Sequence, residues 1–81
     1  MEIDRFKFFN YVIRITDTYD VEGRKALLFE VWGNPKWFPL PTMWHEWDDG
    51  SIYSYRSYRN REEYFNSYFN GLHEAIVLIL V

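Results

Sequence analysis

The chain has 81 residues, of which 22% are aromatic and 26% are charged, and its net charge is −3 at pH 7. This aromatic content excludes a disordered segment, because disordered chains have few aromatic residues and a high net charge. The length excludes two independent domains, since a domain usually needs on the order of 100 residues. We therefore expect one compact domain over residues 1–81.

Charge and cysteine content narrow the class of protein. Proteins that bind double-stranded DNA are usually basic, and this chain is mildly acidic. The chain has no cysteine, so it has neither disulfides nor a cysteine zinc site, which favours a cytoplasmic protein. The first residues do not resemble a signal peptide, and the apolar run Ala75–Val81 is far shorter than the roughly 20 residues of a membrane helix. We expect no membrane contact.

The first predicted strand covers about Lys7–Tyr19, where apolar and polar side chains alternate. The alternation changes phase at Phe8–Phe9, which predicts a bulge or a bend at that point. The apolar face of this strand is expected to carry Phe9, Tyr11, Ile13 and Ile15.

A second strand is predicted over Lys25–Trp32, after a hairpin loop whose glycine can adopt a positive φ. A three-residue loop, Glu22–Arg24, would place Ile15 opposite Val31, and we prefer this register because it pairs apolar residues. A helix over Arg24–Trp32 is the alternative. The strand would carry one apolar face, formed by Leu27, Phe29 and Val31.

The middle of the chain predicts an extended loop followed by a hairpin. Two prolines exclude an interior strand over Lys36–Pro41. Met43–Trp47 and Ser51–Tyr58 then flank Asp48-Asp49-Gly50, a favourable hairpin turn. The second arm alternates, with Tyr53, Tyr55 and Ser57 on one face and Ile52, Ser54, Arg56 and Tyr58 on the other.

A short helix and a last strand are predicted for the remaining residues. Asn60 is a favourable N-cap with Glu63 three residues later, and Asn70-Gly71 is expected to end the helix. The near-continuous apolar run Glu74–Val81 predicts a strand buried on both faces. The apolar stripe of the helix would consist of Tyr64, Phe65, Tyr68 and Phe69.

These elements predict an α+β fold in the order β-β-β-β-α-β. It would be a mainly antiparallel sheet of four to five strands with one short helix packed on one face, and the last strand in a central position. The core is expected to contain Phe9, Ile13, Leu27, Phe29, Val31, Phe65, Phe69 and the run Ile76–Val81.

The segment Tyr53–Arg61 interleaves three tyrosines with three arginines. Aromatic rings on a sheet beside cations are typical of proteins that hold single-stranded nucleic acid. The same residue types form hot spots of protein interfaces. An ordinary strand that packs its tyrosines on the core and exposes its arginines is equally compatible with this pattern.

Tryptophans concentrate between residues 37 and 47, beside three prolines. Tryptophan buries a large area and is enriched at interfaces, although a loop that caps a small core would also use it. We take the region 37–59 as the candidate partner-binding surface, with Trp37, Phe38, Trp44, Trp47, Tyr53, Tyr55, Arg56, Tyr58 and Arg59.

No metal, cofactor or catalytic site is predicted. The histidines occur as His45-Glu46 and His73-Glu74, and adjacent residues on a strand point to opposite faces, so neither pair can chelate an ion alone. A nucleophilic cysteine is absent, the serines lie outside any nucleophile-elbow sequence, and the glycines form no phosphate-binding loop.

The sequence therefore favours a non-enzymatic interaction module that binds or inhibits a protein partner through an aromatic and arginine-rich surface. By analogy of size and class alone, it is comparable to phage or virus proteins that inhibit host defence. Two alternatives stay open. One is a module that binds single-stranded nucleic acid or a nucleotide, and the other is a structural protein that self-associates as a homodimer.

Overall fold

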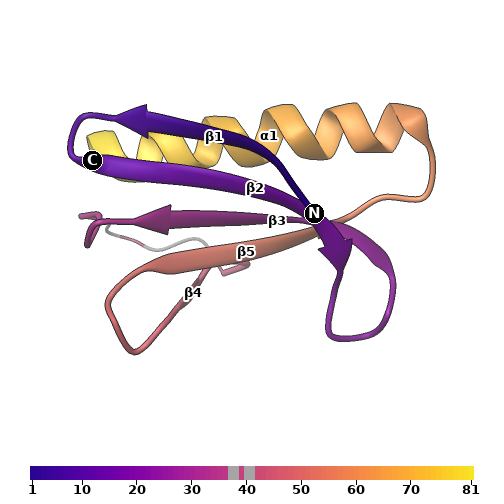
Figure 1. The fold of residues 1–81 in the computed structure, drawn as a ribbon, viewed down its shortest axis with the longest axis horizontal. Coiled ribbons are helices and arrows are strands. Elements are labelled where there is room, and N and C mark those ends of the chain that lie inside the picture. The colour runs from indigo at the N-terminus through magenta and orange to yellow at the C-terminus, as the bar shows by residue number, and fades with distance from the viewer. Residues whose placement is uncertain (37–38, 40–41) are drawn as a thin grey trace.

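The computed structural model describes residues 1–36, 39 and 42–81. Five strands precede one C-terminal helix, α1 (Arg61–Leu80). The strands form an antiparallel sheet in the order β1-β2-β3-β5-β4, and α1 packs on one face of it (Figure 1). This arrangement confirms the predicted α+β class. The strands are β1 (Glu2–Phe8), β2 (Tyr11–Tyr19), β3 (Lys25–Trp32), β4 (His45–Glu46) and β5 (Ile52–Ser57).

The predicted strand Lys7–Tyr19 is interrupted in the structure: most of it forms β2, and its first two residues end β1, which begins at Glu2 and was otherwise not predicted. β1 and β2 are joined by a tight turn in which Phe8 pairs with Tyr11. Phe9 has a φ of 57°, which is uncommon for a bulky side chain and reverses the chain. The phase change at Phe8–Phe9 therefore marks this turn, and the expectation of one continuous strand was wrong.

The hairpin between β2 and β3 has a different register from the one predicted, because Ile15 lies opposite Phe29 and not opposite Val31. The loop is longer than expected. The Asp20 carboxylate closes it by accepting hydrogen bonds from two backbone amides, those of Glu22 at 2.9 Å and Arg24 at 3.0 Å. Since the shift is two residues, every side chain keeps its predicted face.

The predicted second hairpin is confirmed. The backbone amide of Trp47 donates to the carbonyl of Ser51 at 2.8 Å, and Gly50 adopts a φ of 86° in the turn between β4 and β5. Ile52 and Ser54 are buried, which assigns the even-numbered face of β5 to the core.

The strand predicted over Glu74–Val81 is wrong, because α1 continues through Gly71 to Leu80. Gly71 does not end the helix. A Cβ atom at this position would lie 2.3 Å from the Phe29 ring, so glycine lets the helix approach the sheet closely. A short apolar run does not distinguish a buried strand from a buried helix, and here packing on the sheet overrides the β-branched composition.

The core lies between α1 and the sheet. Of the residues expected there, Phe9, Phe65 and Phe69 are instead 68%, 45% and 62% exposed, and Val77, Leu80 and Val81 of the run Ile76–Val81 are exposed as well. The helix turns Tyr64 and Tyr68 toward the core, and the phenylalanines that follow each of them lie on its outer flank. Among the described residues, no helix is both long and apolar enough to cross a membrane. The buried apolar residues are Ile13, Ile15, Ala26, Leu27, Phe29, Val31, Trp44, Ile52, Ala75, Leu78 and Ile79.

Candidate functional site

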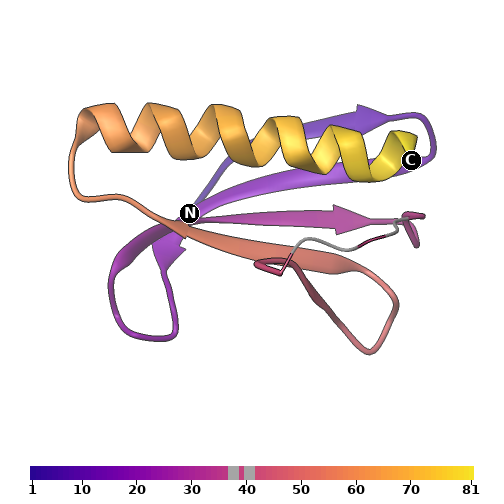
Figure 2. The same cartoon turned by 180° about the vertical axis from the view of Figure 1, so that it is seen from behind.

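The two faces of the sheet differ in what covers them. Phe29 points toward α1, where it meets Gly71, so its neighbours on β3 point to the opposite face. Figure 1 looks onto this opposite face, and Figure 2 looks onto the helix. No described element packs on it, and we call it the open face. Its central side chains are Arg14, Leu28, Glu30, Trp32, Tyr53 and Tyr55, as the strand register requires.

Aromatic rings stack in a column across the open face. Trp32 and Trp47 stack with their centroids 5.3 Å apart, and Trp47 stacks on Tyr53 at 4.3 Å. His45 and Tyr55 flank Tyr53 at 5.4 and 5.9 Å. These five side chains form what we call the aromatic column, in which the rings come from β3, β5 and the β4–β5 hairpin.

Strand register explains why the column forms. Tyr53 lies opposite His45 on β4, so their rings share one face. The backbone amide of Trp47 donates to the carbonyl of Ser51, the buried residue before β5, which places Trp47 beside the start of that strand. Its ring there stacks on Trp32 at the end of β3.

A buried carboxylate lies beneath the column. Glu30 is only 1% exposed. It accepts two hydrogen bonds from the guanidinium of Arg14, at 2.8 and 2.7 Å, and one from the indole Nε1 of Trp32 at 3.1 Å. A buried charge is tolerated only when it is paired and hydrogen-bonded. The bond from Trp32 also fixes the orientation of the outermost ring of the column.

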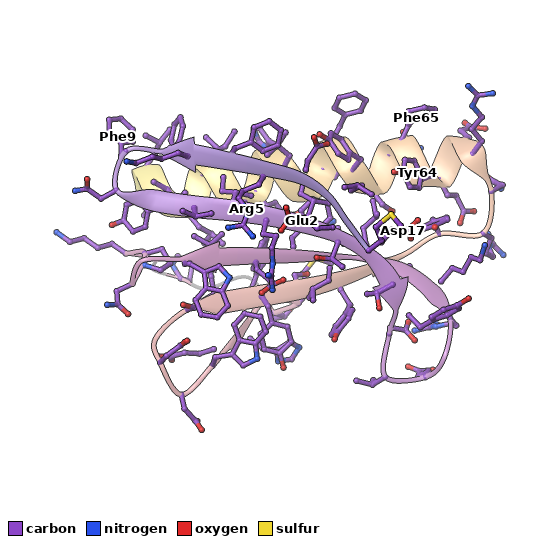
Figure 3. The ribbon with its side chains drawn as sticks, in the orientation of Figure 1. Glu2, Arg5, Phe9, Asp17, Tyr64 and Phe65 are labelled. Atoms are coloured by element: carbon purple, nitrogen blue, oxygen red, sulfur yellow. The ribbon has the colours of Figure 1, made fainter. Side chains whose placement is uncertain are left out.

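Further ionic contacts extend from Arg14 to β1. Glu2 accepts a hydrogen bond from Arg5 at 2.7 Å and lies 4.0 Å from Arg14. Figure 3 shows the side chains of Glu2 and Arg5 together in front of the sheet. The hydrogen bond from Arg5 lowers the pKa of the Glu2 carboxyl. Charged side chains therefore cover the β1 side of the open face.

Carboxylates border the end of the column that Trp32 and Trp47 form. Asp48 and Asp49 are exposed, and the described residues provide no ion-pair partner for either of them. Asp49 accepts a hydrogen bond from the backbone amide of Ser51 at 2.9 Å. We call Asp48 and Asp49 the acidic rim. A hollow of about 330 Å³, the rim hollow, is lined by Trp32, Trp47, Asp48 and Asp49.

A second hollow, of about 380 Å³, lies on the other side of the column, between the β2–β3 loop and β5. Tyr53 and Tyr55 line it together with Asp20 and Glu22. Arg24 pairs with both carboxylates, at 3.0 and 3.2 Å, so their charge is largely compensated within the loop. The column is thus flanked by two hollows with different local charge.

Two of the predicted site residues lie on the helix side of the sheet. Trp44 is 3% exposed and donates its indole Nε1 hydrogen to Glu74 of α1 at 3.0 Å. Arg56 forms an ion pair with the same carboxylate, and its side chain is 11% exposed. These contacts connect α1 to β5 and to the segment before β4.

Tyr58 and Arg59 hold the start of α1. The Tyr58 hydroxyl donates to Asp17 at 2.7 Å, and this hydrogen bond raises the pKa of Tyr58 to about 12. Arg59 pairs with Glu63 at 2.9 Å, which lowers the pKa of that carboxyl. Asn60 caps the helix as predicted, because its side chain accepts a hydrogen bond from the backbone amide of Glu63 at 2.9 Å.

Three of the nine predicted site residues, Trp47, Tyr53 and Tyr55, come together on the open face. Trp37 and Phe38 lie outside the described residues. Sequence reasoning missed Trp32 and His45. Their positions in the strands could have identified both residues. Trp32 ends β3 and lies on the same face as Glu30, and His45 pairs with Tyr53 across the hairpin turn.

A separate apolar surface lies on the outer side of α1. Phe65, Phe69 and Leu80 are exposed along one side of the helix, which we call the helix flank. Figure 3 shows Phe65 on this helix and Phe9 at the turn after β1. In the part of the chain that the structure describes, no three histidine, aspartate or glutamate side chains are grouped so that they could hold a metal ion.

No protein-family model, curated protein or solved structure matches this chain.

Proposed function

We propose that this chain is a small, non-enzymatic module that binds a protein partner through the open face of its sheet. The observation that carries the proposal is the stacked column of Trp32, Trp47 and Tyr53, which no described element covers. Tryptophan and tyrosine are the residues most enriched in interface hot spots, where their large rings supply most of the binding energy.

The column is also held in place before any partner arrives. The rings stack on one another, and Glu30 fixes the Trp32 indole through a hydrogen bond of 3.1 Å. Ordering a flexible side chain on binding costs about 0.5–1.5 kcal/mol, so a preorganised surface loses less affinity to this cost. This rigidity supports a docking role.

Binding of single-stranded nucleic acid is the second candidate, because bases can stack on a sheet of aromatic residues. The charges favour a protein instead. Asp48 and Asp49 border the column and would repel a phosphate backbone, whereas Arg56 and Arg59 are paired with helix carboxylates. We expect short single-stranded oligonucleotides at low salt to leave the tryptophan fluorescence unchanged. A salt-sensitive response would instead favour the nucleic-acid function.

Self-association is the third candidate, and the exposed rings of the helix flank favour it. Phe65, Phe69 and Leu80 would be covered if two copies packed through α1. Light scattering at high protein concentration gives the mass in solution. A monomer would eliminate this function, and a dimer broken by Phe69→Ala would establish it.

The absence of cysteine supports a cytoplasmic location for the module. Such a module can act as an inhibitor by covering the active site or binding site of its target, as some phage and virus proteins do. Under this proposal the affected activity belongs to the partner, and the chain itself carries out no reaction.

The test compares aromatic substitutions on the two sides of the molecule. Tyr53→Ala removes the centre of the column, and Phe65→Ala removes an exposed ring from the helix flank. Circular dichroism first establishes that both variants are folded. Each variant is then used to capture the partner from the cells that produce the protein. We expect Tyr53→Ala to lose the captured protein and Phe65→Ala to retain it. Equal recovery with Tyr53→Ala and the unchanged chain would contradict the proposal.

A further inference from the structure

We infer that the rim hollow takes a cationic side chain, an arginine or a lysine, from the protein partner. The inference rests on the proposed function and adds the chemistry that the partner must present. It follows from the position of two indole rings, those of Trp32 and Trp47, beside the carboxylates of Asp48 and Asp49 around one hollow.

Trp32, the outermost ring of the column, and the carboxylates of Asp48 and Asp49 attract positive charge, whereas the faces of Trp47 are stacked on Trp32 and Tyr53. Indole faces carry the strongest negative potential among aromatic side chains and bind guanidinium and ammonium groups. The carboxylates of Asp48 and Asp49 are exposed, and no ion pair within the described ranges engages them. A cation from a partner would therefore gain ring contacts and an ionic contact together.

The geometry of the hollow is fixed by contacts that do not involve a ligand. The Trp32 ring is held by Glu30 at 3.1 Å, and Asp49 is held by the Ser51 amide at 2.9 Å. The volume of about 330 Å³ falls at the lower end of the range for small-ligand sites, about 300–1,000 Å³.

Charge compensation distinguishes this hollow from its neighbour. Beside Tyr55, the carboxylates of Asp20 and Glu22 are already paired with Arg24 at 3.0 and 3.2 Å. Arg14 is likewise engaged by Glu30 at 2.7 Å and does not occupy the rim hollow. The acidic rim therefore provides the uncompensated negative charge that a basic partner would meet.

The first experiment uses a small probe and needs no partner. The protein is titrated with N-acetyl-arginine methylamide and, separately, with its uncharged citrulline counterpart, while NMR follows the indole N–H signals of Trp32 and Trp47. We expect saturable shifts with arginine that decrease as salt is added, and no saturable shift with citrulline. Equal responses to both probes, or none to arginine, would overturn the inference.

Variants then locate the site. Replacing both rim carboxylates, in Asp48→Asn/Asp49→Asn, should weaken arginine binding about fivefold, which corresponds to the loss of roughly 1 kcal/mol of cation recognition. Glu62→Gln removes an exposed carboxylate from the first turn of α1 and should leave binding unchanged. An equal loss in both variants would mean that the probe responds to net charge alone, which would overturn the inference.

Partner capture separates the inference from the proposed function. If the rim variant loses the partner and Glu62→Gln retains it, the cation site is supported. If the rim variant retains a partner that Tyr53→Ala loses, the open face binds the partner but the cation site is overturned. If Tyr53→Ala also retains the partner, the proposed function itself fails, and the inference fails with it.

Discussion

The two faces of the sheet achieve stability in different ways. On the covered face, aliphatic side chains and Phe29 pack against α1, and Gly71 lets the helix approach closely. On the open face, aromatic rings stack above an ion pair between Arg14 and the buried Glu30. The covered face thus depends on packing within the chain. The open face pairs its buried carboxylate, Glu30, within the chain and still leaves aromatic area accessible to a partner.

The largest expected effect comes from the covered face. Phe29→Ala removes a fully buried ring from the centre of β3, and we expect a loss of about 3–5 kcal/mol in the free energy of unfolding. Urea denaturation followed by circular dichroism measures this loss. A cost below about 1 kcal/mol would show that the packing of Phe29 against α1 does not hold the sheet and helix together.

The ion pair of the open face gives the next effect. Arg14→Met leaves the Glu30 carboxylate buried without its main partner, and we expect a cost of about 3 kcal/mol. Arg5→Met is the control, because the Arg5–Glu2 pair is exposed and solvent screens it, so its loss should cost much less. Equal costs in urea denaturation would remove the distinction between the buried pair and the surface pair.

The contact between α1 and the sheet is tested by Gly71→Ala. The added methyl group would overlap the Phe29 ring, which costs about 1–3 kcal/mol, although alanine favours the helix by about 1 kcal/mol. We expect a net loss of stability. Phe29→Leu replaces the ring with a smaller side chain. In a double-mutant cycle, Gly71→Ala should therefore cost less stability in the Phe29→Leu background than in the unchanged chain. Simple additivity would mean that the two residues do not press against each other.

Alkaline pH should weaken two hydrogen bonds that tyrosine hydroxyls donate to the sheet. Tyr68 lies in α1, and Tyr58 lies just before this helix. The hydrogen bond to Asp17 raises the pKa of Tyr58 to about 12, and burial, with a hydrogen bond to Asp4, raises the pKa of Tyr68 to about 12. Because these values exceed the ordinary pKa of about 10, the stabilisation is complete below pH 10 and is lost as the pH rises toward 12.

The double variant Tyr58→Phe/Tyr68→Phe checks this effect through its melting temperature. It should be less stable than the unchanged chain at pH 8, and the difference should shrink between pH 10 and 12. A constant difference over this range would show that the two hydroxyls do not account for the alkaline dependence.

Local patterns predicted much of the fold. The β2–β3 hairpin, the β4–β5 turn and the Asn60 cap each depend on a few neighbouring residues with strong preferences. The end of α1 could not be predicted in this way, because Gly71 resembles a helix stop until Phe29 is placed beside it. Composition also could not separate Trp47, which lies on the open face, from Trp44, which is buried against Glu74.

The candidate site was therefore predicted in part. Alternation along β5 put Tyr53 and Tyr55 on one face and Arg56 on the other, but it could not say which face α1 covers. Which face α1 covers depends on the packing of the whole helix. Glu74 lies in the part of α1 beyond Gly71, so Arg56 can pair with it only because the helix continues past this glycine. Trp32 was missed because it joins the column only through the register of β3 and β5.

The central claim is that the open face binds a partner and the helix flank does not. Hydroxyl-radical footprinting of the purified complex tests it directly, because the method reports the exposure of individual aromatic side chains. We predict that Trp32, Trp47 and Tyr53 become protected when the partner is bound, while Phe65 and Phe69 on the helix flank stay reactive. Protection of the two phenylalanines with an unchanged aromatic column would contradict the account.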